Sequence, residues 1–137
     1  RINNPNVEFA TLIDPTVVFL SNYKIGEGSI ICANTIISVD VEVGRHNIID
    51  WACTLGHDDV TGDYCSIMPG CNISGKVHLK EGVFLGTGSK IIQGYTVGEN
   101  VIIGAGAVVN KDIPANCTAV GIPAKVRKWH EKDYLDI

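Results

Sequence analysis

Aliphatic residues recur at every sixth position of the chain, from Val7 to Val109. Of the eighteen positions in this register, seventeen are Val, Ile, Leu or Phe, and Thr61 is the exception. A period of six matches neither an α-helix, with a period of about 3.6, nor an alternating strand, with a period of about 2. It is typical of a solenoid in which each short strand points one aliphatic side chain inward and then turns a corner.

A second register, two residues before each aliphatic position, should point inward from the same strand face. Most of its members are small Thr, Ser, Val, Cys or Ala residues, but Asp59 also falls on it. A buried carboxylate is costly unless it is hydrogen-bonded, and the inward Thr61 is the partner that we expect. A catalytic role for Asp59 is the alternative.

The residues two places after each aliphatic position indicate how many strands complete one coil. Five of them are charged and stand eighteen positions apart: Glu27, Arg45, Asp63, Glu81 and Glu99. The other residues of this class between Glu27 and Ala105 are all uncharged. The repeat of eighteen predicts three strands per coil, and so a triangular solenoid of about six coils, roughly 29 Å tall. Two of its three corners are poor in charge, which favours contact with another subunit.

The hexad register ends after Val109, and the chain changes character there. We take residues 1–112 as the solenoid domain and residues 113–137 as a C-terminal bend followed by a short helix. The spacing from Val126 to Leu135 is compatible with a helix that caps the open end of the solenoid.

Composition narrows the class of protein further. A formal net charge of −4 argues against a general nucleic-acid surface. No segment is long and apolar enough to span a bilayer, and none has the pattern of a secretory signal. None of the five cysteines forms a C-x-x-C pair, and Cys53, Cys65 and Cys71 fall on the small-residue register. We interpret them as reduced core residues of a cytoplasmic protein, and we expect no metal site and no membrane partner.

Several motifs resemble the hexapeptide-repeat acyltransferases. Ile25–Ser29 and Ile103–Ala107 fit the family's repeat of an aliphatic residue, a glycine and a small residue. Gly121–Lys125 is similar to the bend that closes many of these enzymes. Leu55–Asp63, which reads LGHDDVTGD, resembles the active-site segment of one branch. That branch contains sialic acid O-acetyltransferases and nucleotide-amino-sugar N-acetyltransferases, and the resemblance spans about residues 10 to 128.

The resemblance implies a left-handed parallel β-helix that assembles as a homotrimer, with acetyl-CoA bound between adjacent prisms. It also implies transfer of an acetyl group to an amine or hydroxyl of a sugar or nucleotide sugar. In such relatives the reaction serves the synthesis of bacterial glycans in capsule, lipopolysaccharide or glycoprotein. Relatives usually carry an N-terminal nucleotide-binding domain, and this chain begins at Arg1 without one. We therefore expect it to be the C-terminal half of a longer protein.

Acetyl transfer from a thioester needs a base for the attacking amine or hydroxyl and a donor for the developing oxyanion. His57 is the candidate base, because imidazole accepts a proton near neutral pH. The resemblance implies that Asp58 orients the ring and that the backbone N–H of Gly75 faces the intermediate. Gly75 should lie one coil beyond His57, where a side chain would crowd the thioester. The alternatives are a solvated corner histidine and a glycine required by local backbone angles.

We expect five positions to contact acetyl-CoA: Ser66, Gly75, Thr87 and Ala105 by the same resemblance, and Lys125 by its charge. Thr87 and Ala105 share a corner on successive coils, where small residues keep a cleft open. Ser66 stands where the branch often has histidine, which places that contact in doubt. Lys125, with Arg127 and Lys128, could meet the CoA phosphates or simply be solvated.

Two other functions fit a solenoid of this kind. A γ-type carbonic anhydrase binds zinc through three histidines, two of them five residues apart. The gaps between successive histidines here are 11, 21 and 52 residues, so no such pair exists. A non-catalytic scaffold also stays open, because the fold alone specifies no chemistry. A scaffold would not need His57 beside Asp58 or a bare Gly75 on the next coil.

Overall fold

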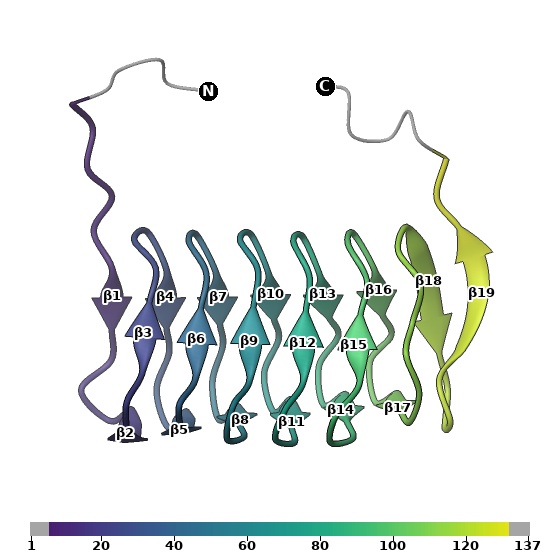
Figure 1. Cartoon of the computed structure of the whole chain (residues 1–137), viewed down its shortest axis with the longest axis horizontal. Helices are drawn as coiled ribbons and strands as arrows, with labels where there is room; N and C mark the ends of the chain where they lie inside the picture. Colours follow the sequence, from purple (N-terminus) through teal and green to yellow (C-terminus); the bar gives the residue numbers. More distant parts are fainter. Residues whose placement is uncertain (1–5, 132–137) are drawn as a thin grey trace.

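The computed structural model describes residues 6–131, which wind into a prism of three parallel sheets (Figure 1). Sheet A contains β1 (Leu12–Ile13), β4 (Ile30–Ile31), β7 (Ile48–Ile49), β10 (Ser66–Ile67), β13 (Phe84–Leu85), β16 (Ile102–Ile103), β18 (Cys117–Val120) and β19 (Lys125–Trp129). Sheet B contains β2 (Val18–Ser21), β5 (Ile36–Val39), β8 (Thr54–Leu55), β11 (Asn72–Ile73), β14 (Lys90–Ile91) and β17 (Val108–Val109). Sheet C contains β3 (Lys24–Ile25), β6 (Glu42–Val43), β9 (Val60–Thr61), β12 (His78–Leu79) and β15 (Thr96–Val97).

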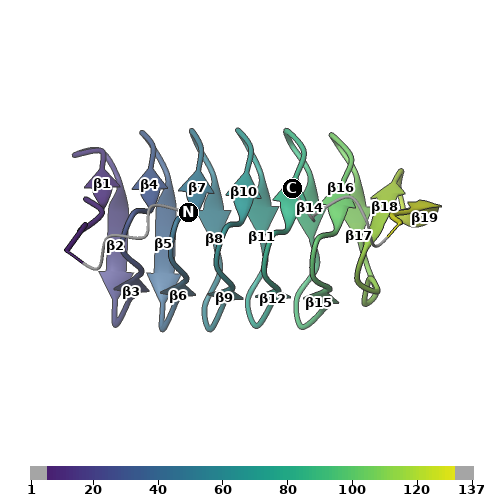
Figure 2. The same ribbon diagram turned by 90° about the horizontal axis from the view of Figure 1, so that it is seen from above.

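Successive coils stack with a register of eighteen residues, which confirms the three-sided repeat. Asn72 of β11, for example, pairs with Thr54 on one side and with Lys90 on the other. Figure 2 shows the coils following one another along the prism axis. We name each corner by the two sheets that meet there. Trp51 marks the A–B corner, His57 the B–C corner and Asp63 the C–A corner.

The corners are tight turns whose last residue has a positive φ. Asp58 has φ 59° and Lys76 has φ 60°, although left-handed backbone is uncommon outside glycine. Hydrogen bonds between coils hold these turns: Asp58 N donates to Val39 O at 3.0 Å, and Lys76 N to His57 O at 2.7 Å. The corners are therefore hydrogen-bonded from coil to coil, as the strands are, and a corner side chain has a fixed neighbour above and below.

The aliphatic register fills the interior, as the sequence predicts. Leu55 and Ile73, on successive coils of sheet B, are both buried. Burying one such side chain contributes about 1.5–3 kcal/mol of stability. The small-residue register is buried beside it, and Cys53, Cys65 and Cys71 are buried free thiols.

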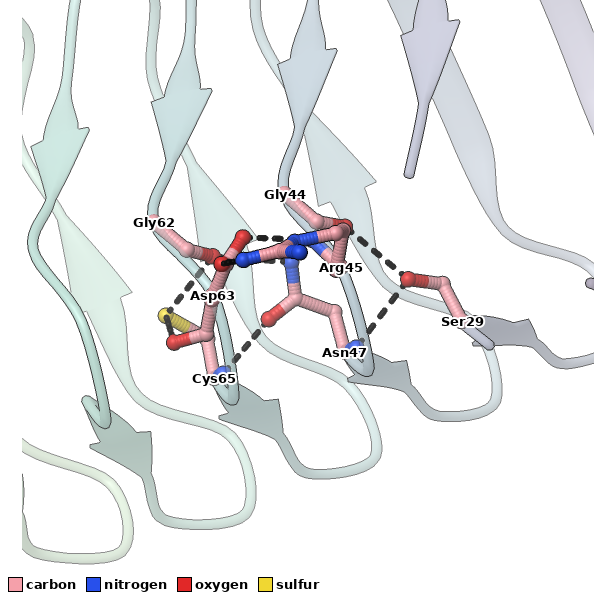
Figure 3. A network of polar contacts seen from close by, with 7 residues as sticks. All are labelled: Ser29, Gly44, Arg45, Asn47, Gly62, Asp63 and Cys65. Carbon is pink, nitrogen blue, oxygen red and sulfur yellow. Dashed lines mark hydrogen bonds and ion pairs between the residues drawn. The ribbon is translucent and has the colours of Figure 1, made fainter. Parts of the chain in front are cut away.

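Thr61 interrupts the aliphatic register because a buried amide needs it. Asn47, buried at the inner side of the C–A corner, donates from Nδ2 to Thr61 Oγ1 at 2.9 Å and to Gly62 O at 3.0 Å. Its Oδ1 accepts from the backbone N–H of Cys65. Figure 3 shows Asn47 between Ser29 and Cys65 of the neighbouring coils, with the exposed Arg45–Asp63 ion pair (2.7 Å) at the same corner. A neutral amide thus joins two coils from inside the prism.

The prediction of a C-terminal helix is wrong for the described residues. No helix occurs within residues 6–131, and Lys125–Trp129 forms β19, which runs antiparallel to β18. The last strand of sheet A would otherwise leave a row of unpaired backbone groups, and β19 pairs with them. Val126, at the start of the expected helix, packs against the core from this strand. Residues 132–135 of the expected helix lie outside the described part of the chain.

Candidate active site

His57 lies on the B–C corner, in the turn between β8 and β9. Its Nδ1 is 2.7 Å from Oδ2 of the adjacent Asp58. About half of each side chain is exposed, 49% for His57 and 50% for Asp58. The positive φ of Asp58 follows directly from its place in the turn, so the corner geometry that closes the coil also sets this pair.

Gly75 occupies the same corner one coil further on, as the repeat of eighteen predicts. A Cβ atom built on Gly75 would lie only 2.4 Å from Nε2 of His57 and 2.5 Å from its Cδ2. The imidazole therefore lies against bare backbone, and any other residue at position 75 would displace it. The φ of Gly75 is not in the left-handed region, so space rather than backbone angle requires glycine here.

This geometry separates the roles of the two ring nitrogens. When Nδ1 donates its hydrogen to Asp58, Nε2 carries the free lone pair and can accept a proton. Within residues 6–131 the Gly75 N–H donates to no acceptor, and the Cα of the same residue lies against the imidazole. Gly56 is essential to this approach, because a Cβ there would lie 2.4 Å from the Gly75 nitrogen. The corner thus presents a base next to an unpaired backbone donor.

Asp59 is buried directly behind this pair, but its partners differ from the expected one. Its Oδ2 accepts from Gly56 N at 2.7 Å and its Oδ1 accepts from Val77 N at 2.9 Å. Thr61, which we expected to bind Asp59, pairs with Asn47 instead. The expectation failed because sequence spacing does not show which buried N–H groups lack an acceptor.

Burial raises the pKa of Asp59 to about 7. The two backbone hydrogen bonds and the nearby His57 act in the opposite direction and lower this pKa, whereas Asp58 raises it slightly. Asp59 is therefore a titratable group near neutral pH, next to the candidate base.

The residues expected to bind acetyl-CoA do not gather on the His57 corner of one chain. Thr87 and Ala105 lie on the A–B corner, one coil apart, where Gly106 N donates to Thr87 O at 2.9 Å. Ser66 opens β10 in the middle of sheet A, paired with Ile48 and Phe84. Lys125 is exposed at the start of β19. Only Gly75 of the five lies beside His57.

Sheet A presents an apolar outer face that our sequence analysis missed. The residues one place before the aliphatic register point outward, and on sheet A five of them are large, apolar and exposed: Leu12, Ile30, Ile48, Phe84 and Ile102. Ser66 interrupts the row between Ile48 and Phe84. On sheet C the same row reads Lys24, Glu42, Val60, His78 and Thr96. Grouping the outward residues that stand eighteen positions apart would have revealed this difference between the sheets.

Nothing in the described residues brings together three or more His, Cys, Asp or Glu side chains in a way that could hold a metal ion. Two histidines that we did not single out have local partners. The ring of His46 stacks on Tyr64, with centroids 5.3 Å apart, and His130 Nε2 lies 2.8 Å from Thr118 Oγ1. Within residues 6–131 we also find no helix with the length and apolarity that a membrane span needs.

Comparison with known proteins gives matches in sequence and in structure. Residues 76–111 match the family described as bacterial transferase hexapeptide (six repeats). A serine acetyltransferase of Synechococcus elongatus is 44% identical over 80 residues, which are 53% of this chain and 33% of that protein. A histidine-to-asparagine mutant of perosamine N-acetyltransferase from Caulobacter crescentus, solved with CoA and GDP-perosamine, is similar with a TM-score of 0.87 and 33% identity. That match covers 88% of this chain and 58% of the other.

A second solved structure is equally similar. The acetyltransferase domain of PglB from Neisseria gonorrhoeae, in complex with acetyl coenzyme A, gives a TM-score of 0.87 and 33% identity. The match covers 89% of this chain and 60% of that one. The chain thus spans between a third and about three fifths of the length of each of these three proteins.

Proposed function

Because the chain belongs to the hexapeptide-repeat left-handed β-helix acyltransferases, we propose that it carries the acetyl-transfer site of an enzyme that uses acetyl-CoA. The acceptor in this proposal is an amine or hydroxyl of a sugar or nucleotide sugar, in the synthesis of a bacterial glycan. The observation that carries the proposal is the corner on which His57, paired with Asp58, lies over the bare backbone of Gly75.

His57 acts as the general base in this mechanism. Its Nε2 takes the proton of the acceptor as the acceptor nitrogen or oxygen bonds to the acetyl carbonyl carbon. Asp58 holds the hydrogen on Nδ1 and stabilises the imidazolium that forms. The carbon–sulfur bond then breaks, and the leaving CoA thiolate takes the proton back from Nε2. The Gly75 N–H stabilises the negative charge on the carbonyl oxygen in between.

Acetyl-CoA, the acetyl donor, is bound in this proposal between two copies of the chain. The support is geometric: Ser66, Thr87 and Ala105 lie on sheet A or the A–B corner, away from His57 of the same chain. If the apolar face of sheet A packs against a neighbouring prism, these residues can approach the B–C corner of that neighbour. We therefore propose a homotrimer, with Lys125 available to the CoA phosphates.

The acceptor class rests on the proteins that are similar to this chain. The Caulobacter enzyme was solved with GDP-perosamine and is named for N-acetylation, whereas the Synechococcus protein is named for serine. The base chemistry of His57 serves an amine and a hydroxyl equally. A nucleotide sugar is the proposed acceptor because the Caulobacter enzyme, solved with GDP-perosamine, matches 88% of this chain, whereas the Synechococcus match spans 53% of it.

The test replaces His57 in the complete natural protein and measures acetyl transfer from acetyl-CoA to a panel of nucleotide sugars by mass spectrometry. We expect His57→Ala to lower kcat by roughly 100-fold or more, the usual contribution of a general base, with an unchanged fold. His78→Ala, an exposed histidine on the outer face of sheet C, is the matched control and should stay near wild type. Activity of His57→Ala within a few-fold of wild type would remove His57 from the mechanism.

A further inference from the structure

We propose that Asp59 is a positioning residue of the His57 centre: its buried carboxylate clamps the backbone of Gly56 and Val77 and so fixes the imidazole over Gly75. This inference rests on the proposed function, because it assigns Asp59 to the reaction that His57 performs. It assigns no contact with substrate to Asp59, whose side chain lies inside the prism.

The clamp joins the two coils that form the site. Asp59 is 1% exposed, and its two oxygens bind different coils. Oδ2 accepts from Gly56 N, directly before His57, at 2.7 Å. Oδ1 accepts from Val77 N, two residues after Gly75, at 2.9 Å. One side chain therefore ties the segment that carries the base to the segment on which the base lies.

The chemistry of the two partners explains why this position holds a carboxylate. Inside the C–A corner, Asn47 makes an equivalent clamp with a neutral amide, because its partners are of both kinds. The N–H of Cys65 donates to its oxygen, and the Thr61 hydroxyl and the Gly62 carbonyl accept from its NH₂ group. At Asp59 both partners are N–H donors. An amide would face one of them with its own NH₂ group, whereas a carboxylate accepts from both.

The carboxylate is also the acceptor that the Val77 N–H needs. Gly56 N has a second acceptor, Ile73 O at 2.9 Å, whereas within residues 6–131 Val77 N donates to Asp59 alone. An apolar residue at position 59 would leave this buried N–H unpaired. The inward neighbours of Asp59 on the adjacent coils, Val41 and Val77, are apolar and buried, and so they offer no substitute.

The charge that Asp59 carries once it is ionised, above its pKa of about 7, gives the clamp a second effect on His57. The ionisable groups around Asp59 are His57 and Asp58 on its own turn, and Asp40 and Lys76 at the same corner of the adjacent coils. When Asp59 is ionised it stabilises the imidazolium that forms at His57 during proton transfer. Removal of the charge should therefore make His57 a weaker base in addition to loosening its position.

The test compares Asp59→Asn and Asp59→Val in the complete protein with Cys53→Val, a buried control on the A–B side. Each Asp59 variant should lower kcat roughly ten- to hundredfold with little change in the KM for acetyl-CoA, as misplacement of a base does. The acidic limb of the kcat/KM profile should move to lower pH, because His57 loses a stabilising charge. Cys53→Val should leave the profile in place, whatever it does to stability.

The outcomes separate this proposal from the proposed function. If His57→Ala is inactive while the Asp59 variants keep wild-type kcat and an unmoved pH profile, Asp59 is only structural and the positioning role is overturned. If His57→Ala is active, the proposed function itself fails. If Asp59→Val does not fold, the Asp59→Asn variant decides the question. The imidazole resonances of His57 are then followed by NMR as a function of pH. The proposal requires the midpoint of this titration to differ from that in the wild type.

Discussion

A single hydrogen atom at Gly75 determines where the imidazole of His57 lies. The atom that any other residue would add at that point falls 2.4 Å from Nε2, closer than van der Waals contact permits. The neighbouring coil cannot move away to make room, because Lys76 N holds His57 O at 2.7 Å. With any other residue at position 75, the imidazole of His57 would therefore have to move.

Gly75→Ala should accordingly displace the ring, lower the thermal midpoint and remove most acetyl-transfer activity. The two side chains oppose each other directly, so their effects on stability should not add. We expect the stability loss of Gly75→Ala to disappear in the His57→Ala background, measured as a double-mutant cycle of thermal midpoints. An undiminished loss in that background would mean that His57 does not lie over Gly75.

Asp59 should make stability depend on pH in a direction opposite to that of most carboxylates. Its pKa is raised from 3.8 to about 7, so the unfolded chain releases the proton at lower pH than the folded one. The stabilising contribution of Asp59 is then complete below about pH 4 and is lost as the pH rises to about 7. Asp63 acts in the other direction, because Arg45 lowers the pKa of its carboxyl.

The measurement that isolates Asp59 is the difference in unfolding free energy between wild type and Asp59→Asn. Urea denaturation at pH 5 and pH 8 should show wild type losing its relative advantage as the pH rises. The pKa shift of Asp63 cancels in this difference, because both proteins retain Arg45 and Asp63. A difference that stays constant between the two values, or grows with pH, would contradict the raised pKa of Asp59.

At the scale of the strands, the sequence determines the fold because each strand contributes one side chain to a narrow interior. The hexad therefore predicts the strands, and the spacing of charges by eighteen predicts which strands stack, as the pairing of Thr54 with Asn72 confirms. His57 and Gly75 are brought together by this rule alone. Because the backbone has so little conformational freedom at each corner, the stacking of the strands can be predicted from the sequence alone.

The features that the sequence failed to predict, strand β19 and the partners of Asp59 and Thr61, depend on which polar groups lack a hydrogen-bond partner in the stacked coils. Val126 has helix-compatible spacing, but the open edge of β18 recruits the segment as β19. Asp59 and Thr61 lie on one face, yet each pairs with a group on another coil, the Val77 N–H and the Asn47 amide. Both errors concern acceptors and donors that become unpaired only once the coils are stacked.

At the scale of the whole molecule, the outer faces of sheets A and C differ, and only that of sheet A has the apolar row expected of a subunit contact. The outer row of sheet C contains Lys24 and Glu42, which form an exposed ion pair at 2.7 Å. The outer row of sheet A contains five exposed large apolar residues in register. Apolar surface of this extent on one face is typical of a contact between subunits. The proposed trimer buries this face and brings Ser66 of one copy towards the neighbouring prism.

Charges placed on sheet A should therefore disrupt assembly and acetyl-CoA binding together. We expect Ile48→Glu and Phe84→Glu, the residues on either side of Ser66, to convert the trimer to a monomer in light scattering coupled to size-exclusion chromatography. Binding of acetyl-CoA, measured by calorimetry, should weaken by at least tenfold, because each site would lose the residues of its neighbour. Val60→Glu, in the outer row of sheet C, is the matched control and should leave both measurements unchanged. If both sheet A variants remain trimers, the interface lies on another face. If they remain trimers but bind acetyl-CoA weakly, sheet A contributes to the acetyl-CoA site and not to the interface.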